Sequence, residues 1–198
     1  MEKIKKVKAI KYENEQSHEV SEKIIKDENI NLQINQLPQR KFSTYPENLE
    51  DFVIGYLSGE GLINKVEDIE KIEKNGKNIN IRIKPTEIDT KGGCILSDCG
   101  GGWRSEIKKI TPVKSNLKIN ATDILQNIQR LKKEAPLWKQ TGGTHVAQII
   151  YKDNYIIRED VSRHVAVDKV IGAAINKDYD LRSEERRVGK ECRSRWSP

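Results

Sequence analysis

A cysteine beside three glycines is the first feature of the sequence that could do chemistry. Cys99 stands in "SDCGGGWR" (residues 97–104) and is followed directly by glycines at 100–102. The thiolate is the reactive form of cysteine, and positive charge or oriented backbone amides favour it. Glycine amides can turn towards an anion, and Arg104 supplies positive charge nearby. Residue types alone leave two interpretations open: a reactive thiol on a glycine hinge, or a surface cysteine in a loose loop.

The other cysteines do not complete a disulfide framework or a metal site. Cys94 and Cys192 bring the total to three, which is too few and too unevenly spaced for a set of bridges. A structural zinc site normally takes four ligands, and the three histidines form no ligand pattern around Cys94 and Cys99. Gly102 stands where a redox Cys-x-x-Cys motif would have its second cysteine. We therefore expect no structural metal.

The segment "TGGTHVA" (residues 141–147) is a candidate phosphate-binding turn. Two glycines before His145 would let backbone amides approach a phosphate, with the hydroxyls of Thr141 and Thr144 as further donors. An ordinary turn leading into an apolar strand explains the same residues. The motif alone does not decide between them.

The segment "EDVSRH" (residues 159–164) packs charged groups into a predicted strand-to-helix corner. His164 and Asp168 are four residues apart, so on a helix they share a face and the carboxylate could orient the imidazole. The alternative is a cluster of capping residues and ion pairs at the start of a helix.

Several elements must position these residues. Alternating and apolar runs predict strands at residues 7–12, 20–26, 30–35, 40–44, 66–74 and 79–85, the last two as parts of a meander. Helices are predicted over 47–58 and from Thr122 or Asp123. "TGGTHVAQIIY" and "NYIIRED" predict a hairpin with a buried strand, and "SRHVAVDKVIGAAIN" a closing helix capped by Ser162. Residues 84–105 have the least regular pattern of the chain.

Mixed strands and helices predict an α/β or α+β domain. We expect a β-rich segment over residues 1–45, a core over 46–181 and a non-native tail over 182–198. The tail "RSEERRVGKECRSRWSP" resembles the translation of a sequencing adapter, and it implies that the natural protein is cut short after Leu181. A basic tail for nucleic acid is the alternative.

Charge and hydropathy narrow the function classes. The 198 residues carry a net charge of +6, of which the tail contributes six Lys or Arg and three Glu, so that +3 remains. Most of the case for nucleic-acid binding is lost with the tail. No apolar run approaches the roughly 20 residues of a membrane span, and the N-terminus lacks a signal peptide. We expect a cytoplasmic protein that binds neither nucleic acid nor membrane.

Three segments in order resemble one family. "EDVSRHVAVDKVIGAAI" resembles the EDVGRHNAxDKxxG signature of the formate dehydrogenase accessory sulfurtransferase family (FdhD). "TGGTHVA" is similar to its TGGxHxA, and "LEDFVIGYLSGEGLI" to its LaxGfLxxEGii helix. "SDCGGGWR" falls where the family carries its cysteine loop. The resemblance runs from about residue 45 to 180.

The resemblance implies a sulfur carrier that takes a persulfide from a cysteine desulfurase. It would pass the sulfur to the molybdenum or tungsten bis-guanylate (molybdopterin guanine dinucleotide) cofactor of formate dehydrogenase. It also implies a cytidine deaminase-like three-layer core without zinc, and a homodimer. Cys99 would be the catalytic, persulfide-bearing residue. The residues implied at the cofactor pocket are Thr141, Gly142, Gly143, His145, Asp160, Arg163 and His164.

The chain departs from the family pattern in places. Many members have Cys-x-x-Cys in the loop, whereas Cys99 here is followed by glycine. Ser162 replaces a glycine, Val165 replaces an asparagine, and the C-terminal segment is missing. Two other functions stay open: a cofactor-binding chaperone without sulfur chemistry, and a nucleotide-handling enzyme of deaminase ancestry, whose metal ligands are absent from the sequence.

Overall fold

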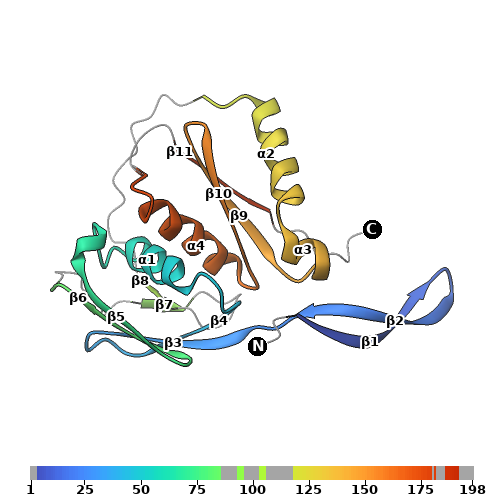
Figure 1. The fold of residues 1–198 in the computed structure, drawn as a ribbon, viewed down its shortest axis with the longest axis horizontal. Helices are drawn as coiled ribbons and strands as arrows, with labels where there is room; N and C mark the ends of the chain where they lie inside the picture. Colours follow the sequence, from blue (N-terminus) through green and yellow to red (C-terminus); the bar gives the residue numbers. More distant parts are fainter. Residues whose placement is uncertain are drawn as a thin grey trace.

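A computed structural model arranges the chain in alternating layers of sheet and helix (Figure 1). The structure describes residues 4–85, 93–95, 103–105, 118–179, 181 and 186–191. Helices α1 (Leu49–Gly59) and α4 (Arg163–Ile175) lie between a four-stranded and a three-stranded sheet. Helices α2 (Ala121–Lys133) and α3 (Pro136–Thr141) cover the other face of the three-stranded sheet. The mixed layers confirm the predicted α/β class, while the deaminase-like topology stays a prediction.

The four-stranded sheet carries the larger apolar core. Its order is β4 (Arg40–Thr44), β3 (Glu28–Ile34), β6 (Asn78–Ile83) and β5 (Ile69–Asn75). Alternate residues of β6 are buried, as the period of two in its sequence requires. Phe42 meets Phe52 and Tyr56 of α1 edge to face, with ring centroids 5.0 Å apart in both pairs. Aromatic packing therefore fixes α1 on this sheet.

The meander prediction is correct for one pairing only. β5 and β6 pair antiparallel, but β6 also pairs with β3 in parallel. Parallel neighbours need a crossover. Here β4, α1, a short 3₁₀ helix (Val66–Asp68) and β5 supply it.

The three-stranded sheet has β9 (His145–Tyr151) at its centre, between β10 (Asn154–Asp160) and β11 (Arg186–Glu191). Ala147 and Ile149 pack against α4, and Val146 packs against α2 and α3. The prediction of a buried strand is confirmed, because neighbours cover both of its faces. β11 lies in the segment predicted to be non-native, and that assignment stays a prediction.

A long hairpin projects from these layers (Figure 1). β1 (Ile4–Glu13) and β2 (Gln16–Ile25) pair antiparallel from Ile4↔Ile25 to Glu13↔Gln16. Ile10 and Tyr12 near its tip are 75% and 71% exposed. The lysine-rich alternation predicts strands correctly, but it supplies too few apolar residues to build a core around them.

Two glycines let α1 and α4 touch backbone to backbone. A Cβ placed on Gly55 would lie 1.8 Å from the Asp168 carbonyl oxygen. A Cβ on Gly172 would lie 1.8 Å from the Asp51 carbonyl oxygen. No side chain fits at either position, so the two glycines set the distance between the helices.

The helix predictions agree with the structure to within a few residues. α1 begins two residues after the predicted start, α2 begins at Ala121, and Ser162 occupies the N-cap position of α4. Its side chain makes no capping bond. α3 was not expected. Within 84–105, β7 (Gly93–Ile95) and β8 (Trp103–Ser105) pair antiparallel, which corrects the expectation of an irregular stretch.

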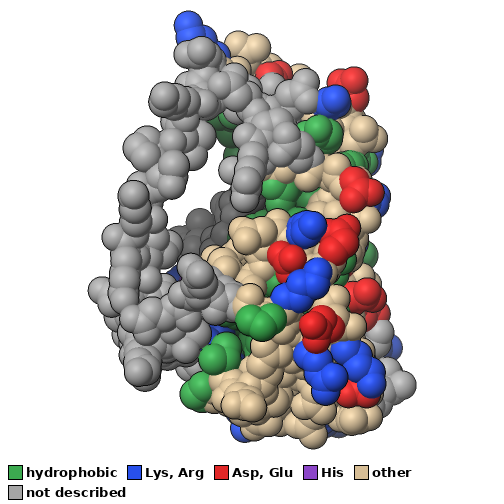
Figure 2. Space-filling model, turned by 90° about the vertical axis from the view of Figure 1, so that its left-hand side faces the viewer, with side chains coloured by type: hydrophobic (Ala, Val, Ile, Leu, Met, Phe, Trp, Pro, Cys, Tyr) green, Lys and Arg blue, Asp and Glu red, His purple; other side chains and the backbone are tan. Residues whose placement is uncertain are grey.

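The surface in Figure 2 shows mixed charge. On this face the acidic and basic side chains of the described residues are interspersed and form no stripe of one sign. That pattern is typical of a solvated surface. Within the described ranges, no helix is both long and apolar enough to cross a membrane.

Candidate functional site

The TGGTH motif ends α3 and starts β9. Gly142 has a φ of 63°, which glycine adopts at little cost, and its amide donates to the Trp138 carbonyl oxygen at 2.7 Å. The amide of Gly143 donates to Thr141 Oγ1 at 3.1 Å. Both amides therefore have acceptors within the chain. In this geometry the glycines shape the turn and do not point their N–H groups at a ligand.

The hairpin register brings the two sequence motifs together. In the β9–β10 pairing, Asp160 lies directly opposite His145. Directly opposed residues of antiparallel strands point to the same face of the sheet. α4 begins three residues after Asp160, at Arg163. The end of TGGTH and the EDVSRH corner thus share one end of the hairpin, 15 residues apart in sequence.

Glu159 holds the glycine turn in place. Its carboxylate accepts hydrogen bonds from the amides of Leu137 and Trp138, at 3.0 and 2.6 Å, in the first turn of α3. It also accepts from Thr144 Oγ1 at 3.0 Å. A carboxylate at a helix N-terminus satisfies amides that have no partner within the helix. Glu159 therefore couples β10 to the start of α3 and to Thr144 within the TGGTH turn.

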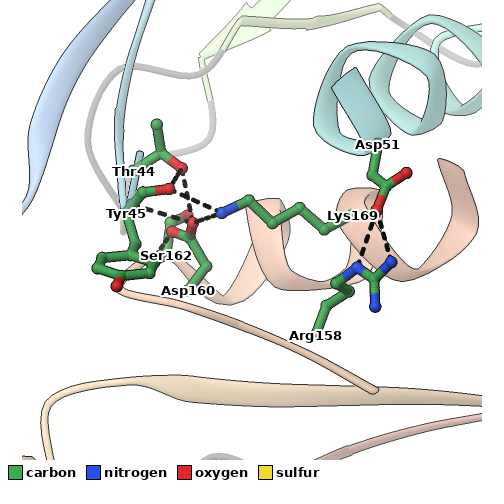
Figure 3. A network of polar contacts seen from close by, with 7 residues as sticks. All are labelled: Thr44, Tyr45, Asp51, Arg158, Asp160, Ser162 and Lys169. Atoms are coloured by element: carbon green, nitrogen blue, oxygen red, sulfur yellow. Dashed lines mark hydrogen bonds and ion pairs between the residues drawn. The ribbon is translucent and has the colours of Figure 1, made fainter. Parts of the chain in front are cut away.

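Asp160 lies on the opposite side of β10 and is completely buried (Figure 3). Its Oδ2 accepts from Thr44 Oγ1 at 2.6 Å, from the Tyr45 amide at 3.1 Å and from Lys169 Nζ at 2.7 Å. Its Oδ1 accepts from the Ser162 amide at 2.8 Å. One carboxylate thus joins the end of β4, the start of α4 and the second turn of α4.

Lys169 completes this network from α4. Its side chain is fully buried, and Nζ also donates to the Tyr45 carbonyl oxygen at 2.8 Å. Burial lowers the pKa of Lys169, and the Asp160 carboxylate opposes that shift. Burial, assisted by the neighbouring Glu47, raises the pKa of Tyr45 to about 12. The Tyr45 phenol therefore stays protonated across the physiological range.

A second ion pair joins β10 to α1, nearer the surface. Arg158 of β10 contacts Asp51 of α1 through Nε at 2.9 Å and through Nη2 at 2.8 Å (Figure 3). Asn176 donates to the other Asp51 oxygen at 3.0 Å. The two side chains of the ion pair are 25% and 14% exposed, so water reaches them.

The remaining predicted residues surround the same corner. His145, Arg163 and His164 are partly exposed, at the start of β9 and in the first turn of α4. Asp168 is buried beside α1, where its backbone faces Gly55. Its predicted role in orienting His164 stays a prediction. Among the described residues, no three His, Cys, Asp or Glu side chains form a group that could hold a metal ion.

The comparisons with known proteins agree with this geometry. The sequence model of the FdhD/NarQ family matches residues 25–185. The chain belongs to that family. A family relative from Methanothermobacter thermautotrophicus, named sulfur carrier protein FdhD, is 40% identical over 170 residues, which are 85% of this chain and 68% of the relative. A relative of the same name from Sulfurisphaera tokodaii is 28% identical, over 85% of this chain and 69% of its own.

A solved structure shares the fold. It is that of a candidate formate dehydrogenase accessory protein from Desulfotalea psychrophila. The TM-score is 0.67 at 20% identity, over 94% of this chain and 72% of that one. At this identity the likeness establishes the fold of the FdhD/NarQ chain described here.

Cys99, the predicted sulfur-bearing residue of this family member, lies outside the described residues. In the sequence it stands midway between β7 and β8, with three residues separating it from each strand. Cys94 belongs to β7, where it pairs with Arg104.

The polar network around Asp160 is not predicted by the sequence. No motif marks Lys169, Thr44 or Tyr45 as partners of the EDVSRH corner, and none marks Glu159 as a partner of α3. One signal is available: Asp168 and Lys169 interrupt an otherwise apolar stretch of α4, and a lysine there is buried only when paired. Thr44 and Asp160 are 116 positions apart in the sequence, so no local pattern indicates that Thr44 is a partner of Asp160.

Proposed function

We propose that this chain is a sulfur carrier that serves formate dehydrogenase. The observation that carries the proposal is its 40% identity to a relative named sulfur carrier protein FdhD, over most of both chains. The meeting of TGGTH and EDVSRH at one end of the β9–β10 hairpin supports it. The substrate is a protein persulfide on a cysteine desulfurase, and the acceptor is a molybdenum or tungsten bis-guanylate cofactor.

Cys99 is the carrier in this proposal. Its thiolate attacks the outer sulfur of the desulfurase persulfide, so that one S–S bond forms as another breaks. The desulfurase cysteine leaves as a thiolate, and no net oxidation occurs. The place of Cys99 in the sequence, where the family carries its cysteine loop, supports this assignment over Cys94, which belongs to β7.

The second transfer delivers sulfur to the metal of the cofactor, which is cargo here and not a resident group. The terminal sulfur of the Cys99 persulfide leaves as a sulfide ligand, and Cys99 returns to the thiolate. Sulfide formation requires two electrons, which the metal supplies by passing from the +4 to the +6 state.

The corner described above is the proposed cofactor pocket. His145, Arg163 and His164 are partly exposed there, and their ring and guanidinium nitrogens suit the phosphates and base of a guanylate. Thr141, Gly142 and Gly143 shape the turn beside them. Asp160 belongs to the pocket as a buried support.

The persulfide step can be tested by mass spectrometry. The purified chain is incubated with a cysteine desulfurase and cysteine, then digested and weighed without reductant. We expect the Cys99 peptide to gain the mass of one sulfur atom in wild type and Cys94→Ala. Gain of the same mass by the Cys94 peptide in Cys99→Ala, or no gain anywhere, contradicts the assignment.

The same variant separates the carrier from the chaperone. A chaperone without sulfur chemistry predicts that Cys99→Ala still activates formate dehydrogenase in a strain lacking the natural protein. The carrier predicts that activation is lost. The proposed homodimer is a separate question, which light scattering of the purified chain answers.

A further inference from the structure

We propose that the buried Asp160–Lys169 pair is a positioning device that holds the start of α4 at the ligand-binding corner without touching the ligand. The inference rests on the proposed function, because it concerns the pocket in which that function places the cofactor. It differs from the family resemblance, which implies Asp160 as a direct pocket residue.

The burial of Asp160 leaves no room for a ligand contact. An ionised carboxylate only accepts hydrogen bonds, and four protein donors contact this one. Three of them bind Oδ2 (Thr44 Oγ1, the Tyr45 amide and Lys169 Nζ), and the Ser162 amide binds Oδ1. The side chain has no exposed surface, and the ammonium group of Lys169 balances its charge.

The same bonds fix the residues that face outward. Ser162 immediately precedes Arg163 and His164, so its amide sets where the first turn of α4 begins. Lys169 ties the second turn to the Tyr45 carbonyl oxygen. Two points of attachment about two turns apart determine both the position and the direction of this helix end.

Glu159 provides the complementary attachment on the other side of β10. It fixes α3 and Thr144, and so the turn that leads into His145. Glu159 and Asp160 are adjacent in β10, and their side chains point to opposite faces because side chains alternate across a strand. Glu159 thus holds the α3–β9 half of the corner, and Asp160 holds the start of α4.

A buried ion pair is weak evidence for stability, because well-packed apolar or neutral residues often replace one without loss. A variant that replaces both charges can therefore keep the fold stable while losing the positioning of α4, which separates a positioning role from a role in stability alone. The double variant Asp160→Asn with Lys169→Met removes both charges and leaves no uncompensated buried ion. The matched control is Asp51→Asn with Arg158→Met, which removes the more exposed ion pair from the same strand, between β10 and α1.

The experiment measures three properties of the full chain in both double variants. Thermal unfolding by circular dichroism reports the fold. Calorimetric titration with GDP, as a probe for one guanylate half of the cofactor, reports the pocket. Hydrogen–deuterium exchange of the peptide spanning residues 160–166 reports whether the start of α4 is held.

We expect the Asp160/Lys169 variant to keep the wild-type spectrum and a cooperative transition. It should bind GDP about tenfold or more weakly, since small displacements at a binding site have large effects. Exchange at residues 160–166 should become faster. The control should match wild type in GDP affinity and in exchange of that peptide.

Two results overturn the proposal: wild-type GDP affinity in the Asp160/Lys169 variant, or unchanged exchange at residues 160–166. Absence of GDP binding to the wild-type chain would contradict the proposed cofactor pocket instead. Exchange of the peptide would still decide whether the pair holds α4.

Discussion

Two ion pairs start from β10, an inner one from Asp160 to Lys169 of α4 and an outer one from Arg158 to Asp51 of α1, and they differ most in burial. Asp160–Lys169 has no exposed side-chain surface, whereas Arg158 and Asp51 keep 25% and 14% of theirs. Water screens the outer pair, so its net contribution to stability is small. The inner pair has protein groups in place of water, so losing one partner leaves a charge that nothing compensates. The N···O distances of the two pairs are similar, 2.7 and 2.8 Å, but breaking them should therefore change stability by different amounts.

The largest loss of stability should come from removing one partner of the inner Asp160–Lys169 pair. Lys169→Ala leaves the Asp160 carboxylate buried beside Thr44 and Tyr45 without a countercharge. We expect a loss of about 3–5 kcal/mol in the free energy of unfolding, measured by urea denaturation. A loss below that of Arg158→Ala would show that burial does not distinguish the pairs.

The next largest loss of stability should come from the contact of Gly172 with the backbone of α1. A methyl group at residue 172 would overlap the Asp51 carbonyl oxygen, so Gly172→Ala must force α1 and α4 apart. We expect a loss of about 3 kcal/mol, at the upper end for overpacking, in the same denaturation assay.

Gly59→Ala is the matched control for that prediction. Its new Cβ would lie 3.8 Å from Asp168 Oδ1, an ordinary contact, in the same helix as Gly55. It should unfold within about 1 kcal/mol of wild type. Equal losses in the two variants would mean that glycine flexibility, rather than helix separation, explains them.

High pH should destabilise the folded chain by ionising the Tyr45 phenol. Its pKa is about 12 in the folded chain and about 10 when unfolded, so the folded state retains this proton longer. The stabilisation is complete below pH 10 and is lost as the pH rises to 12, by roughly 2 kcal/mol. Denaturation across this range should show the fall in wild type and a smaller one in Tyr45→Phe.

The smallest effect should come from the outer pair. Arg158→Ala removes an ion pair that water reaches, so we expect a loss of at most about 1 kcal/mol, further reduced by salt. Denaturation at low and high salt tests this. A salt-independent loss as large as that of Lys169→Ala would place the outer pair in the same class as the inner one.

The sequence predicts the elements of this fold better than their pairing. Period-two alternation identifies β3, β4 and β6, and glycine with an apolar run identifies the β9–β10 hairpin. The parallel contact of β3 with β6 depends on a crossover of over forty residues, which no local pattern encodes. α3 escaped prediction because Glu159, rather than a neighbouring residue, holds its first turn.

The candidate site shows the same division. Both motifs were identifiable by residue type, and Asp160 and His145 lie together as their hairpin requires. The roles within the motif are not identifiable from sequence, since Asp160 and Arg163 are both charged and nothing in the sequence shows that Asp160 is buried while Arg163 is partly exposed. That difference arises from Thr44 and Tyr45, which are remote in the chain.

Asp160 bonds to residues that are far away in the sequence, and this separation also affects folding kinetics. The β1–β2 hairpin pairs neighbours in sequence and can form early, whereas Thr44 meets Asp160 across 116 residues. Contacts of such separation form after the chain has closed its large loop. We expect the Thr44–Asp160 contact to be absent from the folding transition state, so that its loss accelerates unfolding and leaves the folding rate almost unchanged. This contact would then determine how long the folded corner persists, rather than how fast it forms.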